Sequence, residues 1–224
     1  MNKIGLKFIK DTLEQRYSYR FKWMGIPVIQ YPQDLIAMQE IIYEVKPDII
    51  IETGIAHGGS LMFYATLMDT VTDGIVIGID VDIRPQNRKA IMTHPLWYRI
   101  DLIEGSSVNF ETLKKVVRII KKNDVKEPVI MVVLDSLHTH RHVLKELEMY
   151  SPLVSVGSYL VVFDTIIEYL PAGSFPGKPW SVGNNPATAV KEFLTTHPGF
   201  EVDDKIEKRI MITTAPGGYI RRIK

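Results

Sequence analysis

The chain of 224 residues contains no cysteine, which excludes disulfide frameworks, thiolate zinc sites and cysteine nucleophiles. Long apolar runs are also missing: none approaches the roughly 20 residues of a membrane span, and the first ten residues form no signal-peptide core. The formal net charge of +1 gives no electrostatic reason to expect nucleic acid as the main partner. We therefore expect a cytoplasmic protein with no membrane span and no nucleic-acid partner. The basic residues Arg221, Arg222 and Lys224 are expected to form a solvated terminus.

Motifs that would identify several other enzyme classes are missing as well. The chain has no G-x-S-x-G nucleophile elbow and no H-x-D or H-x-E pair to begin the facial triad of a non-haem iron oxygenase. Its most informative glycines follow the pattern G-x-x-x-G-G, not the G-x-G-x-x-G of a dinucleotide site. What is present is an ordinary globular composition, with 46% hydrophobic and 24% charged residues, which suits one α/β core.

From Asp48 onward, apolar β-type runs alternate with stretches of helical period, which predicts a parallel sheet with helices on both faces. The expected strands are Ile49–Glu52, Ile75–Asp80, Leu102–Glu104, Val129–Asp135, Tyr159–Asp164, Val202–Lys205 and Arg209–Thr213, the last two being candidates for antiparallel pairing. The expected helices are Gln33–Val45, Ser60–Met68, Arg84–Thr93, Phe110–Lys122, His140–Tyr150 and Pro186–His197. The fold class is thus α/β: a Rossmann-like three-layer sandwich with a mostly parallel seven-stranded sheet and an antiparallel C-terminal strand. We expect residues 1–46 to form a helical lid or interface segment and residues 47–224 the Rossmann-like domain.

A cofactor site is predicted where three successive strands end. Glu52, Thr53 and Gly54 close the first strand, and Gly59 and Ser60 follow at the start of the next helix. An acidic residue at this point repels a pyrophosphate and favours a ligand that carries an ammonium or sulfonium, as S-adenosylmethionine does.

Two further strand ends extend the predicted cofactor site. Asp80 ends the second strand, where nucleotide-binding α/β folds place a carboxylate for the ribose hydroxyls, and Asp82 is its rival. Ser106 and Ser107 follow the third strand, where the adenine ring is expected. The alternative for all these residues is that they are merely polar strand ends.

A second cluster is predicted at the ends of the fourth and fifth strands. Asp135 and Asp164 end neighbouring strands, which lie about 4.8 Å apart, so the two carboxylates need a cation such as Mg²⁺ or a raised pKa. His138, three residues after Asp135, is the candidate general base. The alternative is that Asp135 caps a helix and Asp164 pairs with a basic residue. His140 and His142 are expected on a helix surface, although His138 and His142 have the spacing of a transition-metal pair.

Two segments outside the strands are candidates for closing such a site. The aromatic-rich stretch Tyr17–Tyr31 is a candidate lid or interface segment. Residues Glu168–Asn185 form a long loop rich in proline and glycine, and loops of that length in a compact domain are usually functional or mobile.

Several of these segments together resemble the cephalosporin hydroxylase family, from about residue 20 to the C-terminus. The segments are Trp23 to Leu35, Gln39 to Ile42, Lys46-Pro47-Asp48, Glu52-Thr53-Gly54 with Gly58-Gly59-Ser60, Asp135-x-x-His138, and Pro216 to Arg221. The resemblance implies a class I S-adenosylmethionine-dependent methyltransferase fold, similar to that of metal-dependent sugar O-methyltransferases.

For the metal, the resemblance implies Mg²⁺ held at Asp135 and at an acidic pair after the fifth strand, with His138 as the base. Here the pair is Phe163-Asp164, so an apolar ring stands in place of one ligand. Thr165 or Glu168 could substitute, or water could fill the position.

The expected function is therefore O-methylation of a sugar or another hydroxylated metabolite, as in polysaccharide or lipopolysaccharide biosynthesis. The expected cofactors are S-adenosylmethionine and Mg²⁺, the acceptor is a small molecule or glycan, and a homo-oligomer is possible. Two alternatives stay open. The chain could bind S-adenosylmethionine without catalysis or with altered chemistry, or it could be a nucleotide-dependent oxidoreductase.

Overall fold

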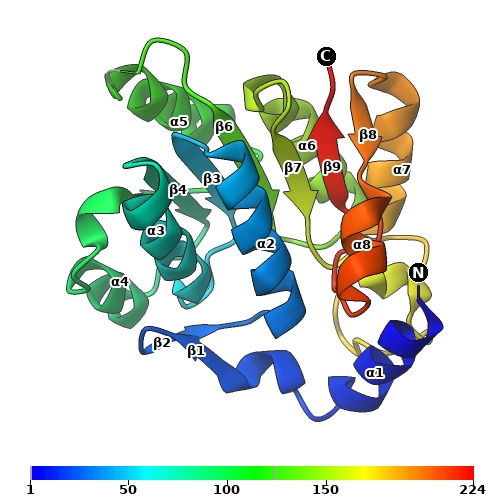
Figure 1. Ribbon diagram of the computed structural model, residues 1–224. Helices are drawn as coiled ribbons and strands as arrows, with labels where there is room; N and C mark the ends of the chain where they lie inside the picture. Colours follow the sequence, from blue (N-terminus) through cyan, green and yellow to red (C-terminus); the bar gives the residue numbers. More distant parts are fainter. Residues whose placement is uncertain (1, 124) are drawn as a thin grey trace.

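A seven-stranded sheet forms the centre of the molecule, which is described here by a computed structural model of residues 2–123 and 125–224 (Figure 1). Its strand order is β5-β4-β3-β6-β7-β9-β8. The strands are β3 (Ile49–Thr53), β4 (Ile75–Asp80), β5 (Ile100–Glu104), β6 (Ile130–Leu134), β7 (Tyr159–Val162), β8 (Phe200–Val202) and β9 (Tyr219–Arg222). Strands β3 to β7 are parallel to one another, and β9 runs antiparallel to both β7 and β8. The predicted fold class is thereby confirmed.

Helices cover both faces of this sheet, because its central strands are apolar on both sides. Every residue of β3 and of β6 is buried. Alternate residues of these strands enter two separate core clusters, one on each face. One face packs against α2 (Pro32–Val45), α3 (Gly59–Val71) and α4 (Pro85–Met92), and the other against α5 (Phe110–Lys122), α6 (His140–Tyr150) and α7 (Pro186–Thr196).

The N-terminal elements lie below the carboxyl ends of the parallel strands (Figure 1). They are α1 (Lys3–Leu13), the 3-10 turn η1 (Tyr17–Arg20) and the hairpin of β1 (Phe21–Trp23) and β2 (Ile26–Val28). A third apolar cluster joins α1 to the segment after β7 through Ile9, Ile166 and Leu170. The N-terminal segment thus packs against the edge of the sheet where ligands bind in open α/β folds. The predicted division of the chain at residue 46 stays a prediction.

The predicted C-terminal strands are partly wrong. Residues 209–213 form no strand; helix α8 (Asp204–Ile210) follows β8 and includes the first two of them. The Asp203 side chain accepts a hydrogen bond from the Lys205 amide and so begins this helix. Ile206, one turn before Ile210, is its buried residue.

The last antiparallel strand is instead β9, which includes two residues of the predicted solvated terminus. The Arg222 guanidinium donates to the carbonyl oxygens of Val154 at 2.5 Å and Pro152 at 3.3 Å, and Arg221 Nε donates to Gly157 O at 3.3 Å. The prediction of a free tail is therefore wrong for both arginines. Their side chains reach backbone carbonyls that the sequence does not reveal.

A buried carboxylate joins α2 to the segment before β9. Asp34 accepts hydrogen bonds from Thr213 Oγ1 at 2.5 Å, the Thr214 amide at 2.9 Å and Tyr219 Oη at 2.7 Å. Burial raises its pKa to about 6, against the effect of these hydrogen bonds. Asp34, which belongs to one of the family-like segments, therefore has a structural role.

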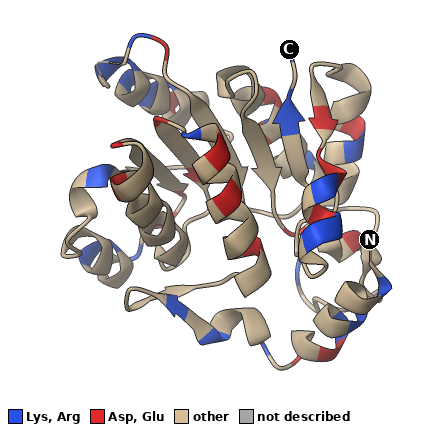
Figure 2. Ribbon diagram, viewed as in Figure 1, with Lys and Arg blue, Asp and Glu red and all other residues tan. Residues whose placement is uncertain are grey.

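Charged side chains are spread over the outer helices, with acidic and basic residues interspersed (Figure 2). Within residues 2–123 and 125–224, no helix has the length and apolar character to cross a membrane.

Candidate active site

A cavity of about 690 Å³ lies at the carboxyl edge of the sheet, within the size range of small-molecule sites. Its lining combines strand ends, the N-terminal segment and the long loop after β7. The strand ends contribute Gly54, Asp80, Ser106, Ser107, Asp135 and Asp164. The other two segments contribute Ile9, Leu13, Tyr17, Gln30, Phe175 and Trp180. Most of the predicted site residues are therefore brought together, and the predicted lid segment does border the cavity.

The glycine loop after β3 is held by close backbone contacts. A Cβ atom at Gly54, where φ is +82°, would lie 2.1 Å from the Asp135 carbonyl oxygen. At Gly59 it would lie 2.2 Å from the carbonyl oxygen of Pro27 in β2. The helix begins at Gly59, with Gly58 as its N-cap, so Ser60 is not the cap. The glycines thus let the loop lie between the end of β6 and the N-terminal hairpin.

Glu52 lies beneath this loop and not in the cavity wall. It is 1% exposed, and its Oε2 accepts a hydrogen bond from Ser60 Oγ at 2.8 Å. Burial raises its pKa to about 8, partly opposed by the Ser60 hydrogen bond. Thr53 is also fully buried, whereas Gly59 and Ser60 border a small cavity of about 20 Å³ that also contacts Gly54 and Asp135. Direct cofactor contact by Glu52 and Thr53 stays a prediction.

Asp80 holds the glycine loop and also faces the cavity. Its Oδ2 accepts hydrogen bonds from the amides of Ile55 at 3.0 Å and Ala56 at 3.3 Å, and Oδ1 accepts one from Asp82 at 3.2 Å. The Asp82 side chain is exposed and does not line the cavity. Asp80 is therefore better placed for a ribose than its rival.

His142 is a cavity residue that the sequence did not reveal. Its Nε2 lies 3.1 Å from Ser107 Oγ and 3.5 Å from the buried Glu146 carboxylate. The expectation that it is a helix-surface residue is wrong, because the start of α6 faces the end of β5 across the cavity. His140 instead contacts α7, with Nδ1 at 2.8 Å from Thr188 Oγ1. Since His138 and His142 have different partners, the structure does not form the i, i+4 metal pair.

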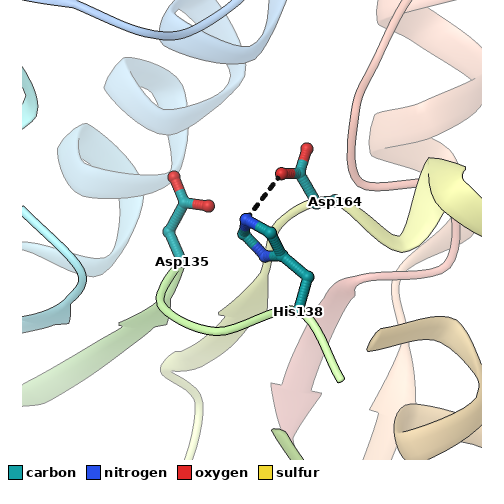
Figure 3. Close-up of side chains that lie close together, drawn as sticks. All are labelled: Asp135, His138 and Asp164. Carbon is teal, nitrogen blue, oxygen red and sulfur yellow. Dashed lines mark ion pairs between the residues drawn. The ribbon is translucent and has the colours of Figure 1, made fainter. Parts of the chain in front are cut away.

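Asp135, His138 and Asp164 form the polar centre of the cavity. The imidazole lies between the two carboxylates, with Nε2 at 3.1 Å from Asp164 Oδ2 (Figure 3). Burial raises the pKa of Asp135 well above its usual range, and the negative charges of Asp164 and Glu52 raise it further. Asp164 itself has φ of +57°, a left-handed conformation directly after Phe163.

The donor atoms of this cluster fit a divalent cation. One atom from each residue lies within 4.8 Å of the others, and two ligands on opposite sides of Mg²⁺ are about 4.2 Å apart. Two carboxylates are ligands that Mg²⁺ prefers, and a cation would offset their mutual repulsion.

One of the three expected ligand positions is apolar, as the sequence indicated. Phe163 is 1% exposed and packs edge-to-face with Tyr219 in the core. Neither predicted substitute faces the cluster: Thr165 Oγ1 donates to Pro216 O at 2.8 Å, and Glu168 Oε2 accepts from Asn185 Nδ2 at 2.5 Å. The third donor near the carboxylates is instead His138, which the sequence assigned as a base, with a transition-metal pair of His138 and His142 as the alternative.

The long loop after β7 forms the aromatic side of the cavity. Glu168 anchors it by also accepting a hydrogen bond from the Gly183 amide at 2.8 Å. Trp180 lies edge-to-face against His138, with ring centroids 4.9 Å apart. Its Nε1 is buried and has no hydrogen-bond partner among the described residues. Tyr17 from η1 and Phe175 complete this apolar side, so a ligand next to His138 would meet aromatic rings.

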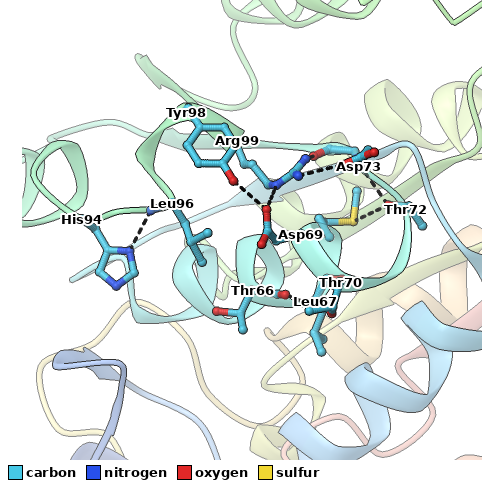
Figure 4. A network of polar contacts seen from close by, with 12 residues as sticks. Thr66, Leu67, Asp69, Thr70, Thr72, Asp73, His94, Leu96, Tyr98 and Arg99 are labelled. Carbon is cyan, nitrogen blue, oxygen red and sulfur yellow. Dashed lines mark hydrogen bonds and ion pairs between the residues drawn. The ribbon is translucent and has the colours of Figure 1, made fainter.

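Strand β5, which leads to Ser106 and Ser107, is held at its start by a network of charged and polar side chains. Arg99, 9% exposed, donates to Asp69 at 2.7 Å and to Asp73 at 2.8 Å, and Tyr98 Oη donates to Asp69 at 2.6 Å (Figure 4). This network joins the end of α3 to the start of β5. It positions β5, and thus the two serines, relative to the glycine loop.

Comparisons with a family model and with individual proteins indicate the same family for this chain. Residues 15–223 match the model of the family described as rhamnosyl O-methyltransferase/CmcI. A rhamnosyl O-methyltransferase of Mycobacterium leprae is 30% identical over 201 residues, which are 89% of this chain and 82% of that protein. The predicted family resemblance and the predicted methyltransferase class are thereby confirmed, and the oxidoreductase alternative has no support from these matches.

Two solved structures show the same fold at lower identity. CmcI with Mg and SAM has a TM-score of 0.61 and 19% identity, covering 92% of this chain and 78% of that chain. The MycE methyltransferase from the mycinamycin biosynthetic pathway, in complex with Mg and SAH, has a TM-score of 0.51 and 17% identity. It covers 82% of this chain and 44% of that chain.

Proposed function

Because the chain belongs to the rhamnosyl O-methyltransferase/CmcI family, we propose that it transfers the methyl group of S-adenosylmethionine to a hydroxyl of a sugar. We further propose that a divalent cation such as Mg²⁺ binds at Asp135 and Asp164. The observation that carries the proposal is the Asp135–His138–Asp164 cluster at the centre of the cavity, with Asp80 on one side and aromatic residues on the other. The M. leprae relative's name supports a sugar acceptor, and the contents of the CmcI structure support the two cofactors.

The order of the strands gives the proposed orientation of the cofactor. Ser106 and Ser107 follow β5, Asp80 ends β4, Gly54 follows β3 and Asp135 follows β6, and these four strands are consecutive neighbours in the sheet. With adenine at the serines and ribose at Asp80, the amino-acid end and the sulfonium lie at β3 and β6. The strand order reverses between those two strands, which is where open α/β sheets bind ligands.

His138 is the proposed base. A lone pair of the acceptor hydroxyl forms the new C–O bond to the methyl carbon, the C–S bond breaks, and its electron pair stays on the sulfur of S-adenosylhomocysteine. The hydroxyl proton passes to the His138 imidazole, whose Nε2 contact with Asp164 orients the ring. A bound cation would supply positive charge that makes a hydroxyl more acidic. Apolar residues around the cluster exclude water from this step.

Methyl transfer from labelled S-adenosylmethionine to methyl α-L-rhamnopyranoside, with Mg²⁺ present, tests the proposal. We expect label in the sugar, loss of transfer in excess EDTA, and loss in Asp135→Asn. Asp82→Asn is the matched control, because Asp82 is an exposed carboxylate outside the cavity. Full transfer in excess EDTA would exclude the metal role.

A second candidate function is a non-catalytic S-adenosylmethionine-binding protein, which Phe163 at the place of an expected ligand favours. In that case the cofactor binds but no label reaches a panel of glycosides. A small glycoside or a glycan as acceptor, a role in polysaccharide or lipopolysaccharide biosynthesis and a cytoplasmic location are further parts of the proposal. Homo-oligomerisation also remains a proposal, and sedimentation measurements would decide it.

A further inference from the structure

Gln30 is a buried polar residue of the cavity, and it does not come from the strand ends of the seven-stranded sheet. It lies between β2 and α2, is 6% exposed, and its Nε2 donates to Asp135 Oδ2 at 3.0 Å. Its other polar atom, Oε1, is buried and has no hydrogen-bond partner among the described residues. When Asp135 is ionised, as the proposed cation requires, an amide oxygen turned toward it would face a carboxylate oxygen, so the nitrogen is the atom that belongs there. The free atom of this side chain is therefore an acceptor.

A buried acceptor without a donor is unfavourable, because it loses its water without gaining a partner. Such groups are rare in folded proteins and call for an explanation. Gln30 borders both the large cavity and the small one beside it, where it meets Gly54, Gly59 and Ser60. A ligand that enters this corner with an N–H donor would satisfy Oε1.

The proposed orientation of the cofactor identifies that donor. Adenine at β5 and ribose at β4 leave the amino-acid end of S-adenosylmethionine at β3 and β6, and Gln30 lies there, beside Gly54 and Asp135. The amino-acid end carries an ammonium group, which has three N–H donors and no acceptor. Ammonium is thus the part of the cofactor that matches a lone carbonyl-type oxygen next to a carboxylate.

We propose that Gln30 anchors the amino-acid end of the cofactor, with Oε1 accepting a hydrogen bond from its ammonium group while Nε2 holds Asp135. The inference rests on the proposed function and adds a cofactor-binding residue from the N-terminal segment. The Gln30 side chain would then bind both the cofactor and Asp135, the carboxylate proposed to hold the cation. Gln30 also joins the N-terminal segment to both of them.

Calorimetry with two adenosyl ligands tests this assignment without any methyl transfer. S-adenosylhomocysteine carries the ammonium, whereas 5′-methylthioadenosine keeps the adenine, ribose and sulfur but lacks the amino-acid end. A hydrogen bond to a charged group contributes about 1.5–3 kcal/mol, which is about tenfold to a hundredfold in affinity. We expect Gln30→Leu to weaken S-adenosylhomocysteine by that factor and to change 5′-methylthioadenosine by less than about twofold.

Gln33→Leu is the matched control. Gln33 lies three residues away on α2, and its Oε1 is also buried without a hydrogen-bond partner in the described part of the chain, but it borders a separate groove beside Ile36 and Glu40. Its replacement should leave both affinities unchanged.

The outcomes separate this inference from the proposed function. If the wild-type protein binds S-adenosylhomocysteine and Gln30→Leu binds it equally well, Gln30 is not an anchor and the proposed function stands. Equal weakening of both ligands in Gln30→Leu would show a role in folding the cavity and overturn the assignment. If the wild type binds neither ligand, the proposed function itself fails.

Discussion

Replacing Glu52 by glutamine should change how the stability of the ligand-free protein depends on pH. Burial raises the pKa of Glu52 from 4.5 in the unfolded reference to about 8 in the folded chain. Between these two values the unfolded chain has lost the proton that the folded chain keeps, so a rise in pH favours unfolding. The stability that the protonated form contributes is fully present below pH 4.5 and is lost by about pH 8.

The size of the effect follows from the same two values. Each unit of pKa corresponds to about 1.4 kcal/mol, so the free energy of unfolding of the wild type falls by about 5 kcal/mol between pH 4.5 and pH 8 because of this one group. Glutamine has the same shape, can accept the Ser60 hydrogen bond and does not titrate. The wild type should therefore lose about 5 kcal/mol relative to Glu52→Gln over this range, or roughly 10–20 °C in Tm for a chain of this size.

Urea unfolding of the ligand-free wild type and Glu52→Gln at several pH values measures this difference. Glu201→Gln, which changes an exposed glutamate on β8, should follow the wild type at every pH. Parallel stability curves for the wild type and Glu52→Gln between pH 5 and pH 8 would refute the reasoning. They would mean that Glu52 ionises freely when the protein is folded. The result also bears on the site, since a Glu52 that is neutral at pH 7 offers less attraction to a cationic cofactor.

Three other changes test separate parts of the cavity. Asp80→Ala should weaken S-adenosylhomocysteine by roughly tenfold or more in calorimetry, because a charge-assisted hydrogen bond is lost; unchanged affinity in the folded variant would remove Asp80 from the site. His138→Ala should lower methyl transfer about 10²- to 10⁴-fold with cofactor affinity unchanged, and near-normal turnover would mean that another group takes the proton. Gly5→Ala places a Cβ atom 1.9 Å from the Met211 carbonyl oxygen and should displace α1, raising KM for the sugar without affecting cofactor binding. Lys10→Ala, an exposed change on the same helix, should have no such effect.

Much of the sheet could be predicted because burial on both faces leaves a direct record in the sequence. The run Ile49–Ile51 has no polar residue, which is typical of a central parallel strand. Polar residues directly after such runs must lie at one edge, so Asp80, Asp135 and Asp164 could be grouped before any coordinates were known. Their grouping depends only on parallel direction, and the topology confirms that direction.

Features that depend on a single backbone angle or a distant partner could not be predicted. The apolar residues within 203–213 fit both the period of a strand and the period of a helix. The hydrogen bond that Asp203 accepts as the N-cap favours the helix. His142 is on a helix whose other side could equally have faced the cavity. Phe163 and Asp164 are neighbours, yet the left-handed conformation of Asp164 separates them: the ring enters the core and the carboxylate enters the cavity. The burial of Glu52 and its hydrogen bond from Ser60 depend on the path of the glycine loop, and its contact with the cofactor stays a prediction.

The distribution of polar and apolar groups along the sheet edge constrains the acceptor. From β5 to β6 the cavity presents serine hydroxyls and carboxylates, which suit an adenosyl group and a cation. Beyond His138 the wall is formed by Trp180, Tyr17 and Leu13, with the buried Trp180 Nε1 as one donor within it and Arg16 and Ser18 as further polar lining residues. A sugar held there would place one hydroxyl at the cluster and a second oxygen at the indole, with its C–H face on the rings. If the chain transfers a methyl group to a sugar, as proposed, the acceptor should therefore combine at least one free hydroxyl with an apolar face that covers the aromatic rings.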